Sequence, residues 1–289
     1  MGSFITRKCL KNAGVELPIN NFAEFKAACD KIQANGVTPV YMSNKENWTA
    51  QIWLLATIQP TLFEDPQFAI DMSQNKAKPS DNEKVVKLLS NLEELRNDGY
   101  LNEDYMSATN TMAEKALMEG QTAFYADFSK LNDYSRDEYE QKLGMMWIPL
   151  WDDESDQVVT VGQAGNFLSV PADNPNADLA KEFVNTLLSK DVLQKYYELL
   201  PGISPYKDLG FDLEQGSLGD ELLSYATDNN LYSDYQSTLV DGKAVLNGFY
   251  GNFSDKIQGL IAGKSVKDTL DDWYNAYAEE AKARNAEGF

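Results

Sequence analysis

Two serine and lysine pairs have the spacing of a histidine-free nucleophile, in which the lysine removes the serine proton. They are Ser73 with Lys76 and Ser204 with Lys207. Four-residue patterns of this kind recur by chance, and the first pair lies in a polar stretch that runs into a proline. Coincidence is therefore the favoured interpretation of both pairs.

The glycine-rich and acidic stretches do not complete a known binding motif. Residues 162–165 lack the lysine and the serine or threonine that finish a phosphate-binding loop. Residues 152–156 are mostly acidic, but the alternating ligands, central glycine and distal glutamate of a calcium loop are missing. The 45 acidic residues leave room for the paired carboxylates of a glycosidase, although no spacing singles out a pair.

Histidine is absent from the 289 residues, which removes several classes of chemistry. The sequence contains no Ser-His or Cys-His nucleophile and no imidazole ligand for a metal ion. Two cysteines, Cys9 and Cys29, are too few for a zinc site of cysteine and histidine ligands. We therefore expect neither a metal nor a cofactor. Cys29 lies on an apolar helical stripe, where it acts as a small hydrophobic residue, so we expect both cysteines to be structurally dispensable.

Composition and charge narrow the classes of partner. The formal net charge is −20, and such an acidic surface repels phosphate groups, so we expect no nucleic acid partner and no docking on anionic lipid. The longest apolar stretch, residues 52–63, is interrupted and too short to span a bilayer. Residues 1–9 lack the apolar segment of a signal peptide. Length and composition favour a globular protein of two domains or one large one.

Aromatic residues give a stronger indication of function. The chain has 13 Phe, 5 Trp and 15 Tyr, more than the predicted helical stripes require. Several fall in predicted loops or at predicted strand ends: Trp48, Phe128, Trp151, Tyr206 and Tyr250. Aromatic faces beside carboxylates and amides suit a carbohydrate, whose ring offers C–H groups for stacking and hydroxyls for hydrogen bonds. For a single aromatic residue burial is the more common role; only the set favours a sugar.

The elements that must position these residues are those of a helix-rich α/β protein. The 3- and 4-residue spacing of apolar positions predicts helices at 22–35, 81–99, around 112–120, twice within 178–200, at 253–262 and from 265. Asp81 and Ser265 are the expected caps of two of them. Strands are predicted at 37–42, 122–126, 144–149 and 167–170. Because strands alternate with helices, a βα architecture is favoured.

Several segments, in their order and spacing, carry a resemblance to a known family. They are residues 11–18, 22–39, 118–125, 170–183, 202–208 and 261–270. Together they resemble family 1 of the extracellular solute-binding proteins, the sugar-binding components of bacterial ATP-binding-cassette (ABC) transporters, which includes maltose-binding protein. The similarity spans nearly the whole chain.

The resemblance implies a type II periplasmic-binding-protein-like fold of two lobes. Residues 1–160 and 207–289 would form a discontinuous C-terminal lobe, and residues 161–206 would cross into an N-terminal lobe that is mostly absent from this chain. The apolar helical faces between 179 and 199 would then be exposed. Relatives carry a signal peptide and a lipid-attachment cysteine further upstream. We therefore expect a lipid-anchored protein on the extracellular or periplasmic face of the membrane, with no signal peptide in this chain.

The resemblance also implies which residues contact a ligand. Those expected at the ligand are Glu46, Asn47, Trp48, Asp127, Phe128 and Tyr250, and those expected at the hinge or cleft are Gln163, Gly165 and Tyr206. Trp48 and Tyr250 match stacking positions, and Phe128 stands close to where relatives usually carry a tryptophan.

The implied function is to capture a carbohydrate, expected to be an oligosaccharide, and to deliver it to an ABC-transporter permease. No catalysis is expected. Two other classes stay open from the sequence: a glycosidase with paired carboxylates and a structural domain of the cell surface.

Overall fold

The computed structural model describes residues 1–58, 65–128, 136–161, 168–199, 208–213, 217–227, 229–233, 239–240, 243–244 and 253–289. Its strands are β1 (Gly2–Thr6), β2 (Thr38–Val40), β3 (Thr122–Asp127), β4 (Leu143–Met146), β5 (Val159–Val161), β6 (Leu231–Ser233), β7 (Leu239–Val240) and β8 (Lys243–Ala244). The α-helices are α1 (Arg7–Ala13), α2 (Phe22–Ala34), α3 (Asn47–Ala50), α4 (Ile52–Leu55), α6 (Pro66–Ser73), α7 (Glu83–Asn97), α8 (Asn110–Glu119), α9 (Arg136–Lys142), α10 (Ala177–Leu187), α11 (Lys190–Leu199), α12 (Ser217–Ser224), α13 (Phe253–Ile261) and α14 (Val266–Ala283). Short 3-10 helices are η1 (Pro79–Asp81) and η2 (Glu154–Asp156).

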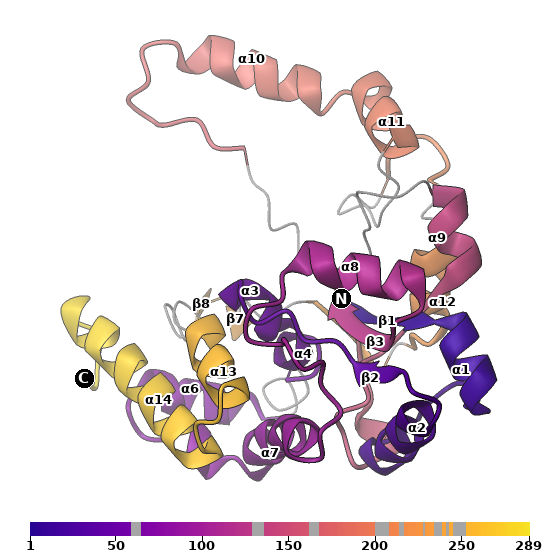
Figure 1. Ribbon diagram of the computed structural model, residues 1–289. Helices are drawn as coiled ribbons and strands as arrows, with labels where there is room; N and C mark the ends of the chain where they lie inside the picture. Colours follow the sequence, from indigo (N-terminus) through magenta and orange to yellow (C-terminus); the bar gives the residue numbers. More distant parts are fainter. Residues whose placement is uncertain are drawn as a thin grey trace.

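Four strands form the main sheet in the order β2, β3, β1, β4. β1 runs antiparallel to both neighbours, with Phe4 opposite Tyr125 on β3 and Met145 on β4. β2 is parallel to β3, with Val40 opposite Phe124. All residues of β1, β3 and β4 are buried, and helices α2, α4, α8 and α12 contact the sheet (Figure 1). The sheet is therefore the centre of a mixed, helix-rich α/β body, as the sequence predicts.

The strand β1 is absent from the strands that the sequence predicts. Its residues are buried on both faces, so no alternation of polar and apolar side chains marks them. Gly2 also lies too close to its neighbours for a larger residue, because a Cβ there would stand 2.6 Å from the backbone oxygen of Met146. A short strand that is buried on both faces is therefore recognised only from the strands that pair with it, here β3 and β4.

Several helix ends agree with the sequence prediction. Gly36 follows α2 with a φ of 73°, and Gly120 follows α8 with a φ of 70°. A left-handed residue of this kind favours glycine, which has no Cβ to clash with the backbone. The Ser265 hydroxyl accepts a hydrogen bond from the Asp268 backbone N–H and begins α14, as predicted.

The start of α7 lies one residue later than predicted. Asp81, the expected cap, belongs to η1, and its carboxylate accepts a hydrogen bond from the Lys78 backbone N–H. The side-chain oxygen of Asn82 accepts instead from the backbone N–H groups of Lys84 and Val85. Both residue types cap helices well, so the sequence alone could not separate neighbouring candidates.

Three predicted strands are shorter or absent, and the first of them, expected at 37–42, is β2, which spans only Thr38–Val40. The strand expected at 144–149 is β4, whose pairing with β1 stops at Met146 opposite Ser3. Trp147 and Ile148 stay buried beyond it, so apolar composition alone overestimated its length. Residues 168–170 form no strand, and Leu168 is 59% exposed; Phe167 lies outside the described residues.

Large aromatic side chains fill the core around the sheet. Phe25 of α2 meets Phe124 of β3 edge to face, with ring centroids 5.0 Å apart. Phe253 and Trp273 join α13 to α14 with centroids 4.5 Å apart, and Trp53 on α4 is fully buried. Burial of each such side chain contributes roughly 1.5–3 kcal/mol of hydrophobic free energy. These rings thus tie the helices around the sheet to one core.

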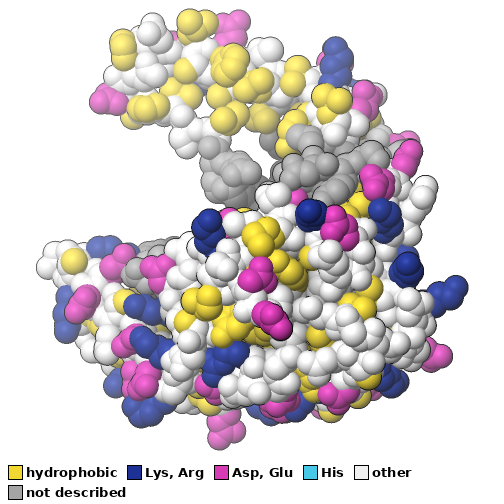
Figure 2. Space-filling view, in the orientation of Figure 1, with side chains coloured by type: hydrophobic (Ala, Val, Ile, Leu, Met, Phe, Trp, Pro, Cys, Tyr) yellow, Lys and Arg dark blue, Asp and Glu magenta, His cyan; other side chains and the backbone are white. Residues whose placement is uncertain are grey.

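Helices α10 and α11 stand away from this core (Figure 1). None of their residues is buried, and the apolar stripe predicted between 179 and 199 is exposed. Phe183 is 63% exposed and Leu199 80%, and hydrophobic side chains are visible over these helices in Figure 2. Contiguous apolar surface of this kind favours association.

After α11 the chain returns to the body that contains the main sheet. β6 pairs in parallel with β5, and the Arg7 guanidinium on α1 donates two hydrogen bonds, of 2.7 and 3.1 Å, to Glu221 on α12. Segments from both sides of α10 and α11 therefore share one body. Within the described residues, no helix is long and apolar enough to cross a membrane.

Both cysteines are buried and free, and burial raises the pKa of each thiol. We predict that the protein, denatured without reductant, releases two titratable thiols per chain. Replacement of Cys9 by alanine should leave folding intact, because a small hydrophobic residue occupies the same place. Thiol titration and thermal melts measure both results. A chain with no free thiol would contradict this account.

The exposed stripe predicts self-association of this chain. Light scattering after size exclusion should report a mass above the 32.4 kDa of one chain, and the double replacement Leu179→Asn with Phe183→Asn should shift it towards the monomer. Replacement of the polar residues Lys181 and Asn185 on the same helix by alanine is the matched control. A wild-type chain that stays monomeric at every concentration would contradict the prediction.

Candidate functional site

The parallel pairing of β2 and β3 brings two of the predicted site segments together. The loop after β2 leads to α3, and β3 ends at Asp127. At this edge Trp48 of α3 stacks on Phe128, with ring centroids 6.4 Å apart and ring planes inclined by 23°. Both rings pack partly against the core and stay partly exposed. They form a pair of aromatic faces, which we call the Trp48–Phe128 pair.

A buried carboxylate lies beside this pair. Asp127 is fully buried, and its Oδ2 accepts a hydrogen bond of 2.8 Å from Asn110 Nδ2. Its Oδ1 accepts a bond of 2.7 Å from the Phe128 backbone N–H. The same Asn110 nitrogen donates to the Tyr125 hydroxyl at 2.9 Å, and Ser43 Oγ lies 2.7 Å from that hydroxyl. The carboxylate is therefore held in a fixed direction by its donors.

Tyr125 stays neutral in this network. Burial raises the pKa of its hydroxyl, and the nearby charge of Asp127 raises it further. The hydroxyl can therefore donate one hydrogen bond and accept others at any physiological pH. The site therefore holds a neutral hydroxyl near its aromatic surface.

Glu46 and Asn47, two further predicted residues, form hydrogen bonds with two other helices. Glu46 Oε2 accepts a hydrogen bond of 3.2 Å from the Asn110 backbone N–H at the start of α8. Asn47 is exposed, and its Nδ2 donates to Asp255 Oδ1 on α13. The structure thus brings Glu46, Trp48, Asp127 and Phe128 together, whereas Asn47 faces α13.

The loop between β2 and α3 is held from both ends. Asn44 is fully buried; its backbone N–H donates to the Tyr105 carbonyl at 2.8 Å and its carbonyl accepts from Gln258 Nε2 at 2.7 Å. Thr49 Oγ1 donates to the carbonyls of Ser43 and Glu46. These bonds fix the direction in which Glu46 and Trp48 leave the backbone.

Sequence analysis missed Asn110, Tyr125 and Ser43. Asn110 follows the Thr109 cap of α8. This local signal indicates a first helical turn, but it gives no indication that Asn110 lies beside β3. In contrast, Trp151 was named with the loop aromatics and is only 3% exposed in the core. Trp151 does lie in a loop, but its burial corrects the expectation that its ring is available to a sugar. The remaining expected residues, Gln163, Gly165, Tyr206 and Tyr250, lie outside the described residues.

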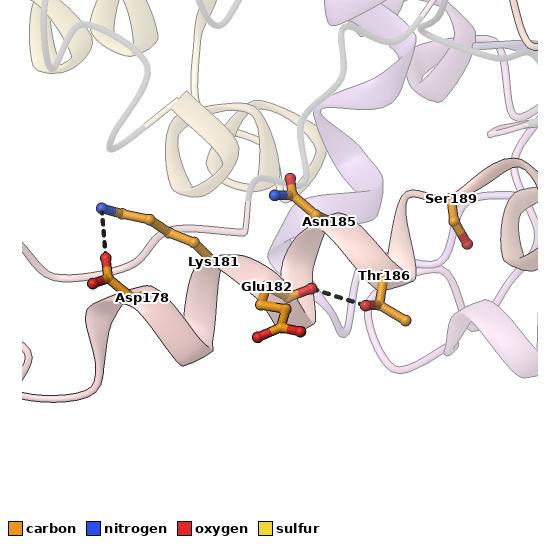
Figure 3. Close-up of a pocket in the computed structure, with 6 residues that line it drawn as sticks. All are labelled: Asp178, Lys181, Glu182, Asn185, Thr186 and Ser189. Carbon is orange, nitrogen blue, oxygen red and sulfur yellow. Dashed lines mark hydrogen bonds and ion pairs between the residues drawn. The ribbon is translucent and has the colours of Figure 1, made fainter.

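The structure also contains an open hollow of about 520 Å³ along α10 (Figure 3). Its lining residues are Asp178, Lys181, Glu182, Asn185, Thr186 and Ser189. The interactions drawn among them, an ion pair of 3.7 Å and a hydrogen bond of 2.9 Å, stay within this one helix. Because the described residues that line the hollow include no aromatic side chain and come from α10 and the turn after it, we place the candidate site at the Trp48–Phe128 pair. In the described parts of the chain, no group of three His, Cys, Asp or Glu side chains could hold a metal ion.

Comparisons with solved structures show the same fold at low sequence identity. A chitin oligosaccharide binding protein has a TM-score of 0.71 at 16% identity, over 98% of this chain and 70% of that one. A sugar transporter protein from Bacillus licheniformis, in complex with stachyose, has a TM-score of 0.69 at 17% identity, over 96% and 71%. A manno-oligosaccharide specific solute binding protein from Bifidobacterium animalis subsp. lactis, in complex with mannotriose, has a TM-score of 0.66 at 17% identity, over 98% and 68%.

No curated protein matches the sequence. The family model described as "Bacterial extracellular solute-binding protein" matches residues 2–210, most of the chain. Members of this family bind solutes and are not enzymes, so the glycosidase considered from the sequence is set aside. The predicted resemblance is therefore confirmed: the chain belongs to the family of bacterial extracellular solute-binding proteins, the solute-binding components of ABC transporters.

Proposed function

We propose that this protein captures a neutral oligosaccharide at the Trp48–Phe128 pair and delivers it to an ABC-transporter permease. The observation that carries the proposal is the stacked aromatic pair beside the hydrogen-bonded carboxylate of Asp127. Sugar rings present C–H faces that stack on aromatic rings, and their hydroxyls donate to carboxylates and amides. The pair supplies the stacking contact, and the partly exposed carboxylate of Glu46, in the segment that carries Trp48, supplies an acceptor for sugar hydroxyls.

The net charge supports a ligand without phosphate or carboxylate groups. The chain carries −20, and Glu46 and Asp127 add negative charge at the site itself. An anionic ligand would be repelled there, whereas a neutral polyhydroxy compound would donate hydrogen bonds to the partly exposed Glu46. A neutral sugar therefore fits the electrostatics better than a sugar phosphate or an acidic peptide.

The names of the structural neighbours agree with this class of ligand. One is a chitin oligosaccharide binding protein, and others hold stachyose, raffinose or mannotriose. Each ligand is a property of the neighbour whose name gives it. Sequence identities of 16–19% show that the fold is shared, but they do not show that the ligand specificity is shared. These ligands supply the class, oligosaccharides, and a first panel to test.

We also propose the lobe division. Residues 1–160 with 207–289 form one lobe, and residues 161–206 cross into a second, whose surface packs against the exposed faces of α10 and α11. The pairing of β5 with β6 and the Arg7–Glu221 ion pair support a shared body on both sides of the crossing. The match covers 70% of the chitin oligosaccharide binding protein, which leaves about 30% of that protein's length unmatched.

In the same proposal Gln163, Gly165 and Tyr206 lie at the hinge and Tyr250 contacts the ligand. We further propose that a lipid anchor holds the full natural protein on the extracellular or periplasmic face of the membrane.

The direct test is a binding panel on the full natural protein. Calorimetric titration with raffinose, stachyose, mannotriose and chitotriose should give saturable binding at one site per chain for one or more sugars. Mass spectrometry of each mixture should show the sugar intact. Absence of saturable binding to these and further neutral oligosaccharides would overturn the proposal, and so would turnover of the sugar.

The aromatic pair generates the sharpest mutational prediction. Trp48→Ala and Phe128→Ala should each weaken sugar binding by roughly 1–3 kcal/mol, if stacking on a sugar is worth about as much as stacking on a nucleic acid base. Because both rings are partly exposed, the melting temperature should fall less than for a fully buried aromatic, whose loss costs about 3–5 kcal/mol.

Phe68→Ala on α6 is the matched control, because Phe68 is also a partly buried ring packed on the core. This variant should lose stability while its affinity stays unchanged. If Trp48→Ala behaves like Phe68→Ala, with normal affinity and a collapsed melting temperature, Trp48 is a core residue and the site assignment fails.

A further inference from the structure

Asn110, in the first turn of α8, contacts both halves of the candidate site. Its Nδ2 donates to Asp127 Oδ2 at 2.8 Å and to the Tyr125 hydroxyl at 2.9 Å, at the end of β3. Its backbone N–H donates to Glu46 Oε2 at 3.2 Å, in the segment that carries Trp48. Figure 1 shows α8 and α3 on the side of the body that faces α10.

The side-chain amide of Asn110 supplies the two donors that Asp127 and Tyr125 accept. Its two N–H hydrogens are used by Asp127 and Tyr125, so its Oδ1 is the atom left to accept a bond. Among the described residues, no donor reaches that oxygen. Asp127 is fully buried, and a buried carboxylate depends on such donors to stay charged.

The charges around Asn110 explain why a neutral amide is required. The groups that face it are the carboxylates of Glu46 and Asp127 and the hydroxyl of Tyr125. Glu114, buried on α8 itself, adds a further negative charge that acts on Tyr125. A carboxylate at position 110 would stand about one hydrogen-bond length from Asp127, where two like charges repel strongly.

We propose that Asn110 is the positioning residue of the sugar site: it fixes the carboxylates of Asp127 and Glu46 relative to the Trp48–Phe128 pair. This inference rests on the proposed function and deepens it. Sugar hydroxyls are then bound by the partly exposed carboxylate of Glu46, and the buried Asp127 beneath it anchors Asn110 and the residue that carries the Phe128 ring. The selected ligand chemistry is a neutral sugar that donates hydroxyl hydrogens while its C–H face lies on an aromatic ring.

The test is the nearly isosteric variant Asn110→Asp in the full natural protein. The probe is whichever of raffinose, stachyose, mannotriose and chitotriose the wild type binds most tightly, measured by calorimetry at pH 7.5 and pH 5.0. At pH 7.5 the variant should bind about tenfold to a hundredfold more weakly, since it loses hydrogen bonds to a charged group and gains repulsion. At pH 5.0 a proton shared between the paired carboxylates restores a donor, so affinity should recover by tenfold or more.

Asn35→Asp is the matched control, because Asn35 is exposed and its Nδ2 donates only to Lys31 of its own helix. This control should match the wild type at both pH values. Asn110→Ser covers the case in which Asn110→Asp does not fold; it should lose affinity without recovery at low pH. Wild-type affinity in a folded Asn110 variant at pH 7.5 overturns the positioning role alone. A wild type that binds no sugar overturns the proposed function, and the positioning role with it.

Discussion

The parallel pairing of β2 with β3 is the constraint on which the candidate site depends. It places the carboxyl ends of both strands at the same edge of the sheet, where the loop to α3 begins and Phe128 follows β3. β1 is antiparallel to β3 and contributes its beginning to this edge, with Gly2 opposite Asp127. The stacking of Trp48 on Phe128 follows from this register. A shift of the register by one residue would turn the side chains of β3, Asp127 included, to the opposite face of the sheet.

Fixed charge is the second requirement of the site, and the same edge satisfies it. An unpaired buried carboxylate costs several kcal/mol, so the carboxylate of Asp127 needs the donors that Asn110 and the Phe128 backbone supply. The buried Asn44 holds the facing loop by bonds to Tyr105 and Gln258. Acceptors that are already oriented lose little entropy when a ligand arrives, which favours affinity for a flexible oligosaccharide.

Sequence reasoning succeeded where the signal is local. The apolar spacing of α2 and α8, their glycine stops and the Ser265 cap are written in neighbouring residues, and the structure has them as predicted. The segments around Trp48 and Phe128 were also found from the sequence, first as aromatic residues in predicted loops or strand ends and then by a resemblance to a family. Their meeting in space needed the parallel register, which no local pattern encodes.

The failures were of two physical kinds. β1 is buried on both faces and too short to show a period, so only its hydrogen-bonded partners define it. Asn110 bonds to Asp127 across a separation of 17 residues, and an asparagine in a first helical turn gives no sign of such a contact. Asp81 and Asn82 were equally good caps, and packing chose between them.

Hydrogen exchange of the full natural protein, with and without a neutral oligosaccharide that it binds, tests the location of the site most directly. Backbone amides exchange slowly where a ligand suppresses local opening, so bound sugar leaves a footprint in sequence. This account predicts new protection in peptides that cover residues 43–50, 109–112 and 125–128. Protection confined to residues 177–189 along α10, with those three segments unchanged, would contradict it.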